Sequence, residues 1–130
     1  NKHPVHLLGI GDPSDIWNLV KWGIDTFDCV SPTRLARHGA ALMKTKLGKI
    51  NIKKSAYKDD LLPIDVNCNC PTCGNYSKSY LHHLIKSEEL LGFQLISIHN
   101  IYFMNNLMAY IRKAIKDDNY DEAEKKWYLI

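Results

Sequence analysis

The sequence has 130 residues, 45% of them hydrophobic and 24% charged, and a formal net charge of +3. This composition is typical of a globular domain and excludes an intrinsically disordered chain. No apolar run approaches the ~18 residues that a membrane-spanning helix needs, and the start does not resemble a secretory leader. We therefore expect a cytoplasmic protein with no membrane partner.

The N-terminal part predicts one strand–helix–strand unit. Residues 4–11 form an apolar run that ends in glycine, as expected of a buried strand. Asp12 and Pro13 suit the N-cap and first position of a helix, which Gly23 would end. Residues 24–30 predict a second strand. Because such a crossover joins parallel strands, the unit belongs either to an open doubly wound sheet or to a (β/α)8 barrel.

A basic segment follows this unit. Residues 31–58 carry eight Lys and Arg and no acidic residue, whereas the rest of the chain has nine Lys and Arg against 14 Asp and Glu. Residues 42–53 predict a hairpin turned at Gly48, which would expose these lysines. The segment indicates a polyanionic partner, with nucleic acid as the first candidate, or else a solvated lysine-rich face.

The remaining chain is predicted to be mostly helical. After a polar linker that ends near residue 67, we expect a helix over 77–91. An apolar strand or extended link over 93–98 would then reverse the chain after Gly92. An amphipathic helix over 100–116 would close the core.

Three of the four cysteines lie within six residues, at Cys68, Cys70 and Cys73. Such close neighbours make poor disulfides, whereas thiolates on a tight loop can converge on one tetrahedral ion. The C-x-C-x-x-C spacing therefore favours a metal site, zinc above all. The alternative is a chance cluster of reduced surface cysteines.

A closed structural site needs a fourth ligand, for which the sequence offers Cys29, His82, His83 and His99. His82 and His83 lie roughly 9–10 Å along the predicted helix from its start, at ~1.5 Å per residue. Helix packing and surface hydrogen bonds are therefore better roles for them. A chain reversal after Gly92 would bring His99 back beside the helix start, so we expect a Cys3His site with His99.

Asp28 lies at the end of the second predicted strand. The carboxyl ends of strands form the ligand crevice in α/β folds, so an acidic residue there is a candidate nucleophile, base or metal ligand. A helix cap or a loop hydrogen bond is the alternative. Arg34 and Arg37 follow six and nine residues later. Two cations just past a catalytic carboxylate suggest a substrate with phosphates near the reacting atom.

Several motifs in chain order resemble the tRNA-guanine transglycosylases, the queuine tRNA-ribosyltransferases. Residues 27–39 look like the nucleophile motif of that family, and residues 8–13 resemble the glycine loop that precedes it. Residues 68–73, followed by 80–84 and 97–100, are similar to the zinc site of the family. The similarity covers nearly the whole chain.

The resemblance implies an α/β fold, namely the C-terminal portion of a (β/α)8 TIM barrel with an inserted zinc-binding subdomain. Residues 1–40 would form the last βαβ unit with the nucleophile loop, and residues 41–67 the basic hairpin and extended linker. Residues 68–116 would form the zinc-binding helical subdomain and closing helix, and residues 117–130 a charged C-terminal helix or tail. Because a barrel needs ~250 residues, we expect the chain to be a fragment that is inactive alone.

The resemblance also implies a reaction, with Asp28 as the nucleophile. Asp28 would attack C1′ of the wobble ribose of tRNA, expel guanine and form a covalent aspartyl–ribose intermediate. A 7-deazaguanine base, queuine or its precursor, would then attack the same carbon. The general base would lie upstream of this chain. One structural zinc per chain would be held by Cys68, Cys70, Cys73 and His99.

Further roles follow from the same resemblance. Leu8, where the family has a methionine, would pack on the bound base. The tRNA anticodon loop would be held by two segments, which comprise Gly9, Ile10, Gly11, Asp12, Pro13, Ser14, Asp15, Thr33, Arg34, Leu35, Ala36 and Arg37. The full-length enzyme would form a homodimer. The alternatives are a non-catalytic, zinc-stabilised tRNA-binding subunit of the same family and an unrelated zinc-ribbon module, which would leave Asp28 unexplained.

Overall fold

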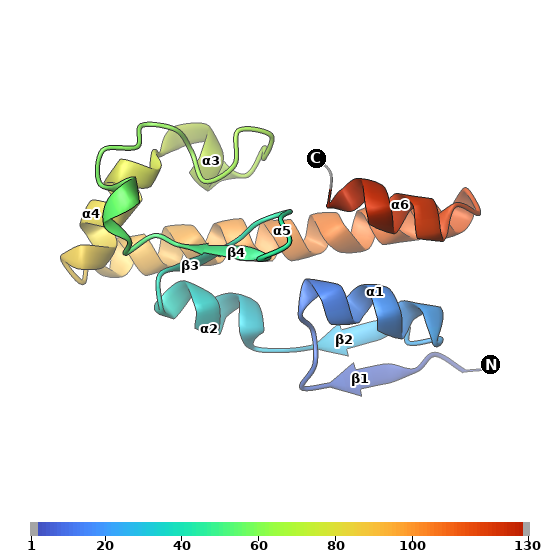
Figure 1. The fold of residues 1–130 in the computed structure, drawn as a ribbon. Helices are drawn as coiled ribbons and strands as arrows, with labels where there is room; N and C mark the ends of the chain where they lie inside the picture. The colour runs from blue at the N-terminus through green and yellow to red at the C-terminus, as the bar shows by residue number, and fades with distance from the viewer. Residues whose placement is uncertain (1–2, 129–130) are drawn as a thin grey trace.

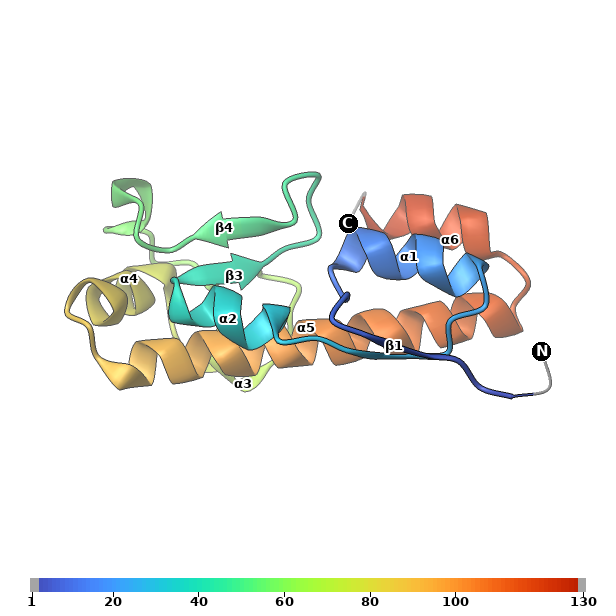
Figure 2. The same ribbon diagram turned by 90° about the horizontal axis from the view of Figure 1, so that it is seen from below.

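The structure is a computed structural model, and it describes residues 3–128. Its longest element is helix α5 (Leu90–Lys116), and the other α-helices and strand β3 (Ala40–Leu42) all pack against it (Figure 1). Strand β3 and helix α2 (Ser31–Arg37) lie along one half of α5 (Figure 2). Helices α1 (Pro13–Lys21) and α6 (Tyr120–Trp127) lie along the other half. The helix therefore connects the two halves of the molecule.

The first two strands and the helix between them confirm the predicted strand–helix–strand unit. Strand β1 (His6–Leu8) and strand β2 (Thr26–Asp28) are parallel, and helix α1 (Pro13–Lys21) joins them. The register places Leu8 opposite Asp28, so the last residues of the two strands are neighbours. Both strands end at the same edge of the sheet, as the parallel arrangement requires.

The basic hairpin is confirmed as well. Strands β3 (Ala40–Leu42) and β4 (Lys49–Asn51) are antiparallel, and Gly48 has a φ of 69° in the connecting turn. Helix α2 (Ser31–Arg37), which was not predicted, lies between β2 and the hairpin. A 3-10 turn, η1 (Ser55–Tyr57), follows β4.

The expected strand over residues 93–98 is wrong, because these residues lie inside α5. Helix α3 (Pro71–Asn75) is followed by α4 (Lys78–Lys86), and the chain reverses before Gly92, at Glu88, whose φ is 56°. Gly92 is helical, and a Cβ there would lie 2.8 Å from the Cβ of Leu84. The glycine thus permits close packing of α4 on α5 and does not break the helix.

The C-terminal segment forms helix α6 (Tyr120–Trp127), which agrees with the predicted charged helix; residues 129–130 of that segment lie outside the described residues. Trp127 is only 1% exposed and packs edge-on against Phe103 of α5. Lys44 of the basic segment lies 4.2 Å from the Trp127 ring centroid. Helix α6 is therefore part of the core.

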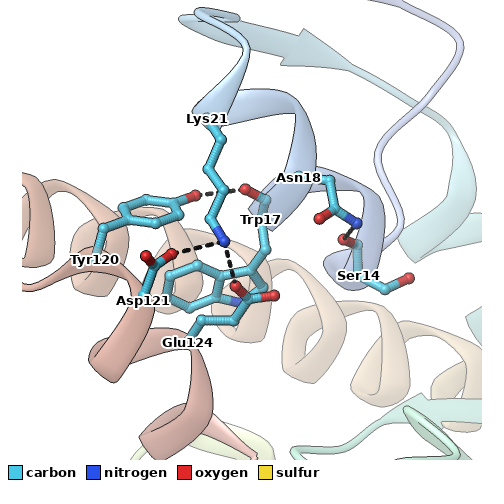
Figure 3. A network of polar contacts seen from close by, with 7 residues as sticks. All are labelled: Ser14, Trp17, Asn18, Lys21, Tyr120, Asp121 and Glu124. Carbon is cyan, nitrogen blue, oxygen red and sulfur yellow. Dashed lines mark hydrogen bonds and ion pairs between the residues drawn. The ribbon is translucent and has the colours of Figure 1, made fainter.

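Helix α6 is attached to α1 by a polar network (Figure 3). The Tyr120 hydroxyl donates a 2.7 Å hydrogen bond to the Trp17 carbonyl. The Lys21 ammonium pairs with Asp121 at 2.8 Å and with Glu124 at 3.0 Å. The hydrogen bond from Lys21 holds the pKa of Asp121 below its usual range. Residues about 100 positions apart in the sequence therefore fix the two helices together.

Buried side chains form two clusters along α5. The first cluster surrounds its N-terminal half and comprises Ala36, Ala41, Ile52, Ile64, Cys70, Cys73, Leu81, Leu84, Ile85, Leu95 and Ile96. The second surrounds its C-terminal half and comprises Ile16, Trp17, Leu42, Phe103, Leu107, Ile111, Ala114, Ala123 and Trp127.

The strands of residues 3–128 form two separate two-stranded sheets and no barrel. The fold of these residues is therefore a mixed α/β arrangement, in which β1, α1 and β2 form the parallel unit that is typical of barrels. In the same range, none of the helices has the combined length and hydropathy that crossing a bilayer requires.

Candidate metal centre and nucleophile strand

Four side chains meet in a buried cluster next to α5. The ligand atoms of Cys68, Cys70, Cys73 and His99 all lie within 4.8 Å of one another. His99 Nδ1 lies 3.8, 3.5 and 3.4 Å from the three sulfur atoms, in sequence order. Zn–S bonds of ~2.3 Å and Zn–N bonds of ~2.0 Å at tetrahedral angles separate S and N by about 3.5 Å. The predicted ligand set therefore fits one tetrahedral ion.

The local sequence explains how the cysteines converge. Pro71 occupies the first position of α3, and Cys70 is its N-cap. The Cys70 sulfur accepts a 3.3 Å hydrogen bond from the Cys73 N–H, so the helix N-terminus faces the thiol and favours its ionised form. The Thr72 hydroxyl, fully buried, donates to the Leu95 carbonyl at 2.6 Å and fixes α3 to α5.

The ring of His99 is oriented by a hydrogen bond on its far side. Its Nε2 lies 2.8 Å from the Leu42 carbonyl, which can only accept, so Nε2 carries the hydrogen. In the neutral ring, Nδ1 then presents a lone pair to the three sulfur atoms. Metal-bound histidines usually have such a second hydrogen bond, and Leu42 supplies it here.

The three thiols do not ionise alike. A hydrogen bond from the Cys73 side chain lowers the pKa of the Cys68 thiol to about 4. The same contact, with burial, raises the pKa of Cys73, and burial raises the pKa of Cys70. Without a cation only Cys68 is therefore readily ionised, and ionising all three thiols side by side needs a positive charge such as a divalent metal would provide.

Asp28 is the last residue of β2, as predicted, and its side chain is exposed. Its carbonyl accepts a 2.8 Å hydrogen bond from the Gly9 N–H, which continues the pairing of β1 and β2 by one residue. Leu8 is 68% exposed beside it. An apolar surface and a carboxylate therefore lie side by side at the open end of the strands.

The segment after Asp28 is helical and has two faces. Thr33, Arg34 and Arg37 are exposed on α2, whereas Ala36 is fully buried and Leu35 is half-buried. The side chains of α2 that remain accessible are thus the two cations and the hydroxyl. Both cations lie on one short helix whose first residue follows Asp28 by three positions.

The glycine loop before α1 lies directly against this segment. Gly9, Ile10, Ser14 and Asp15 are exposed, Pro13 is half-buried, and Gly11 is buried. Asp12 occupies the N-cap position and Pro13 follows at the start of the helix, as predicted, but the Asp12 side chain makes no hydrogen bond to α1. Its carboxylate accepts a 2.8 Å hydrogen bond from the Ser31 hydroxyl instead.

Two residues of the site were missed by sequence reasoning, Ser31 and Asn100. Asn100 is fully buried; its side chain accepts the Leu42 N–H at 2.9 Å and donates to the Pro32 and Ala40 carbonyls at 2.9 and 3.1 Å. The available signal was an amide directly after the predicted ligand His99, since an asparagine that is buried needs hydrogen-bond partners.

Comparison with known proteins finds a family whose sequences cover the residues described above. Residues 1–129 match the family model described as queuine tRNA-ribosyltransferase. A protein of that name from Fusobacterium nucleatum is 48% identical over 124 residues, which cover 95% of this chain and 33% of the relative. The corresponding protein of Roseiflexus sp. is 47% identical over 129 residues, which cover 98% of the chain and 32% of the relative.

A third relative of the same name, from Dehalococcoides mccartyi, is 49% identical over 119 residues, covering 92% of this chain and 30% of the relative. The chain thus spans about a third of the length of the curated relatives it matches. The resemblance noted in the sequence is confirmed over the whole described structure: the chain belongs to the queuine tRNA-ribosyltransferase family.

Proposed function

We propose that this chain is the C-terminal third of a tRNA-guanine transglycosylase, a pentosyltransferase that replaces the wobble guanine of tRNA with queuine or a 7-deazaguanine precursor. The observation that carries the proposal is Asp28, an exposed carboxylate at the end of a parallel strand pair in a chain of this family. The names and lengths of the relatives support it.

The proposed reaction has two displacements at one carbon. A carboxylate oxygen of Asp28 attacks C1′ of the wobble ribose, and the bond from C1′ to guanine breaks with its electron pair going to the base. The nitrogen of the incoming 7-deazaguanine then attacks C1′, and the bond to Asp28 breaks. The proton that guanine gains and the proton that the new base loses are exchanged with groups outside this chain, because the general base is expected upstream.

The surroundings of Asp28 support this role. Leu8 offers an apolar contact for the flat base next to the carboxylate. Arg34 and Arg37 offer cations to the anticodon phosphates, and the remaining glycine-loop residues line the same edge of the strands. The lysines of the hairpin would add a salt-dependent contact to the tRNA backbone.

We propose that the metal is zinc and that its role is structural. Three thiolates and one imidazole are a ligand set that zinc prefers, and four protein ligands leave no position for a substrate. Bound there, zinc would link the cysteine segment and α3 to α5. The thiols also agree with a reducing compartment, so we place the protein in the cytoplasm.

The proposed assembly is a homodimer of the full-length enzyme. Leu61, Tyr76 and Tyr80 line one pocket with Cys73 of the metal centre. Leu62 and Val66, in the segment before the cysteines, are exposed as well. A second copy would cover them. A non-catalytic tRNA-binding subunit of the same family remains the second candidate, and an intact Asp28 favours the catalytic one.

Covalent trapping tests the proposal. Full-length enzyme carrying this chain should form a complex with tRNA that survives denaturing electrophoresis, and Asp28→Asn should abolish it. Asp59→Asn, a matched change at an exposed aspartate elsewhere, should leave it unchanged. Binding of tRNA without any covalent complex in the unmodified protein would favour the non-catalytic subunit. The isolated chain should show no base exchange, since we expect it to be catalytically incomplete.

A further inference from the structure

Asp12 occupies an N-cap position that it does not use. Its backbone is extended, with φ −68° and ψ 145°, as an N-cap requires, and aspartate is among the best capping residues. The carboxylate nevertheless makes no bond to α1 and accepts the Ser31 hydroxyl at 2.8 Å. A side chain that could stabilise its own helix is bonded to a different one.

Ser31 is the donor in this hydrogen bond and is only 7% exposed. Its N–H donates to the Cys29 sulfur at 3.3 Å, and its hydroxyl donates to Asp12. Without Asp12, the Ser31 hydroxyl would lose its partner in a place with little water, which is unfavourable. Ser31 also begins α2, so the bond joins the glycine loop to the helix of Arg34 and Arg37.

The glycine loop, residues 9–12, is also held by a hydrogen bond at its N-terminal end. The Gly9 N–H donates to the Asp28 carbonyl at 2.8 Å. Between the two bonds, Gly11 is packed so closely that a Cβ there would lie 2.7 Å from the Cβ of Cys29. Residues 9–12 and 28–31 therefore form two connections that are joined at both ends and in contact between them, with Asp28 at one end.

We propose that Asp12 is a positioning residue for the transfer reaction, and this rests on the function proposed above. Its hydrogen bond to Ser31 holds the glycine loop against the connection that follows Asp28, so that the nucleophile and the arginines of α2 keep one relative arrangement. The family resemblance would place Asp12 among the residues that hold the anticodon loop; in this proposal Asp12 acts instead through its hydrogen bond to Ser31 and not by contact with RNA. Small displacements of a reacting group lower rates by up to about a hundredfold, so loss of one tether should slow covalent capture about tenfold.

Single-turnover capture of tRNA by the full-length enzyme tests this role. Asp12→Ala, Ser31→Ala and the double variant should each form the covalent complex about tenfold more slowly, because the two residues act as one unit. The KM for tRNA should stay within about twofold, since no RNA contact is removed. Asp12→Asn should stay within about threefold of the parent, because its amide oxygen still accepts the hydroxyl.

Asp59→Ala, at an exposed aspartate outside the site, is the matched control and should be unchanged. Ser31→Ala at the parent rate would overturn the proposal, as would single effects that multiply in the double variant. Asp12→Asn as slow as Asp12→Ala would also overturn it, because charge and not the hydrogen bond would then matter.

A measurement without tRNA separates this proposal from the proposed function. Amide hydrogen exchange at Gly9 should become at least about tenfold faster in Asp12→Ala and in Ser31→Ala, while α5 keeps its protection. If the parent enzyme captures no tRNA, the proposed function fails. The exchange rate at Gly9 then decides by itself whether the hydrogen bond from Ser31 to Asp12 holds the glycine loop in place. Unchanged exchange at Gly9 in both variants would reject it.

Discussion

His99 and Leu42 are joined by a 2.8 Å hydrogen bond from the imidazole Nε2–H to the main-chain carbonyl. The next residue of α5, Asn100, accepts the N–H of the same leucine at 2.9 Å. Two consecutive side chains of one helix therefore bind both polar backbone groups of one strand residue. One of the two is also a candidate metal ligand, so the hairpin and the metal centre depend on the same turn of α5.

Replacing Asn100 with alanine should destabilise the protein strongly. The change leaves the Leu42 N–H and two carbonyls without their partner in a buried place, and such groups cost about 1–3 kcal/mol each. Allowing for relaxation, we expect a loss of about 3 kcal/mol in denaturant-induced unfolding. Asn106→Ala, on an exposed position of the same helix, should change stability by less than about 0.5 kcal/mol. A loss for Asn100→Ala no larger than that of the control would contradict the assignment.

Metal analysis should find about one zinc per chain in gently purified protein, because one Cys3His cluster is present among the described residues. His99→Ala should remove most of the metal, since three cysteines and water hold zinc less well. His83→Ala is the matched control, because His83 is exposed on α4 and should leave the zinc content unchanged. Equal zinc in the two variants would show that His99 is not a ligand.

Gly92→Ala should separate α4 from α5. A Cβ at this position would meet the Leu84 Cβ at 2.8 Å and the Ile85 Cδ1 at 3.0 Å. Overpacking of this kind typically costs about 1–3 kcal/mol, which thermal or denaturant unfolding would detect. Gly74→Ala, where nothing lies within 4 Å, should be neutral or stabilising by up to about 1 kcal/mol. If both changes have the same effect, the contact between the helices is looser than described.

The attachment of α6 to α1 should weaken at alkaline pH, because the Tyr120 hydroxyl loses its proton there. Burial raises the pKa of Tyr120 to about 12, whereas an unfolded tyrosine titrates near ~10. The folded state thus favours the protonated phenol, and its contribution is complete below pH ~10 and is lost as the pH rises toward ~12. The phenol O–H that donates to Trp17 disappears in that range.

Tyr120→Phe removes this hydrogen bond without removing the ring. Its thermal midpoint should lie below that of the parent at pH 8, and the difference should shrink between about pH 10 and about pH 12. The test compares the two proteins in matched buffers of constant ionic strength, so that the ion pairs of Lys21 are equally screened in both. If the difference in thermal midpoint stays constant up to pH 12, the hydrogen bond from Tyr120 to Trp17 does not contribute to stability as described.

The metal site shows what the sequence could and could not specify. The spacing of the cysteines predicts the ion because ligand geometry is local. His99 was also predicted correctly, but through a strand that does not exist: the reversal occurs at Glu88, and the histidine lies on a continuous helix. The chain reversal after Gly92 was predicted wrongly. A glycine that ends a helix and a glycine that lets a neighbouring helix pack closely look alike in sequence.

Strand β2, which ends at the candidate nucleophile Asp28, shows similar limits. A short apolar run, a capping pair and a second run suffice to predict a parallel pair that ends at Asp28. The pairing of Asp12 with Ser31 could not be predicted, because a cap by its own helix is the commoner fate of such an aspartate. Nor could the sequence show the buried amide of Asn100, whose three partners come from α2 and the hairpin start.

The adjacency of His99 and Asn100 limits how this protein can vary. Because one helix turn carries a candidate metal ligand and the amide that binds the start of α2 and strand β3, the two sites cannot change independently. Sequence drift in the cysteine segment should therefore be accompanied by compensating changes in α2, although the two segments are more than thirty residues apart. Removing the metal should loosen the arginine-bearing helix as well as the loop that holds the ion.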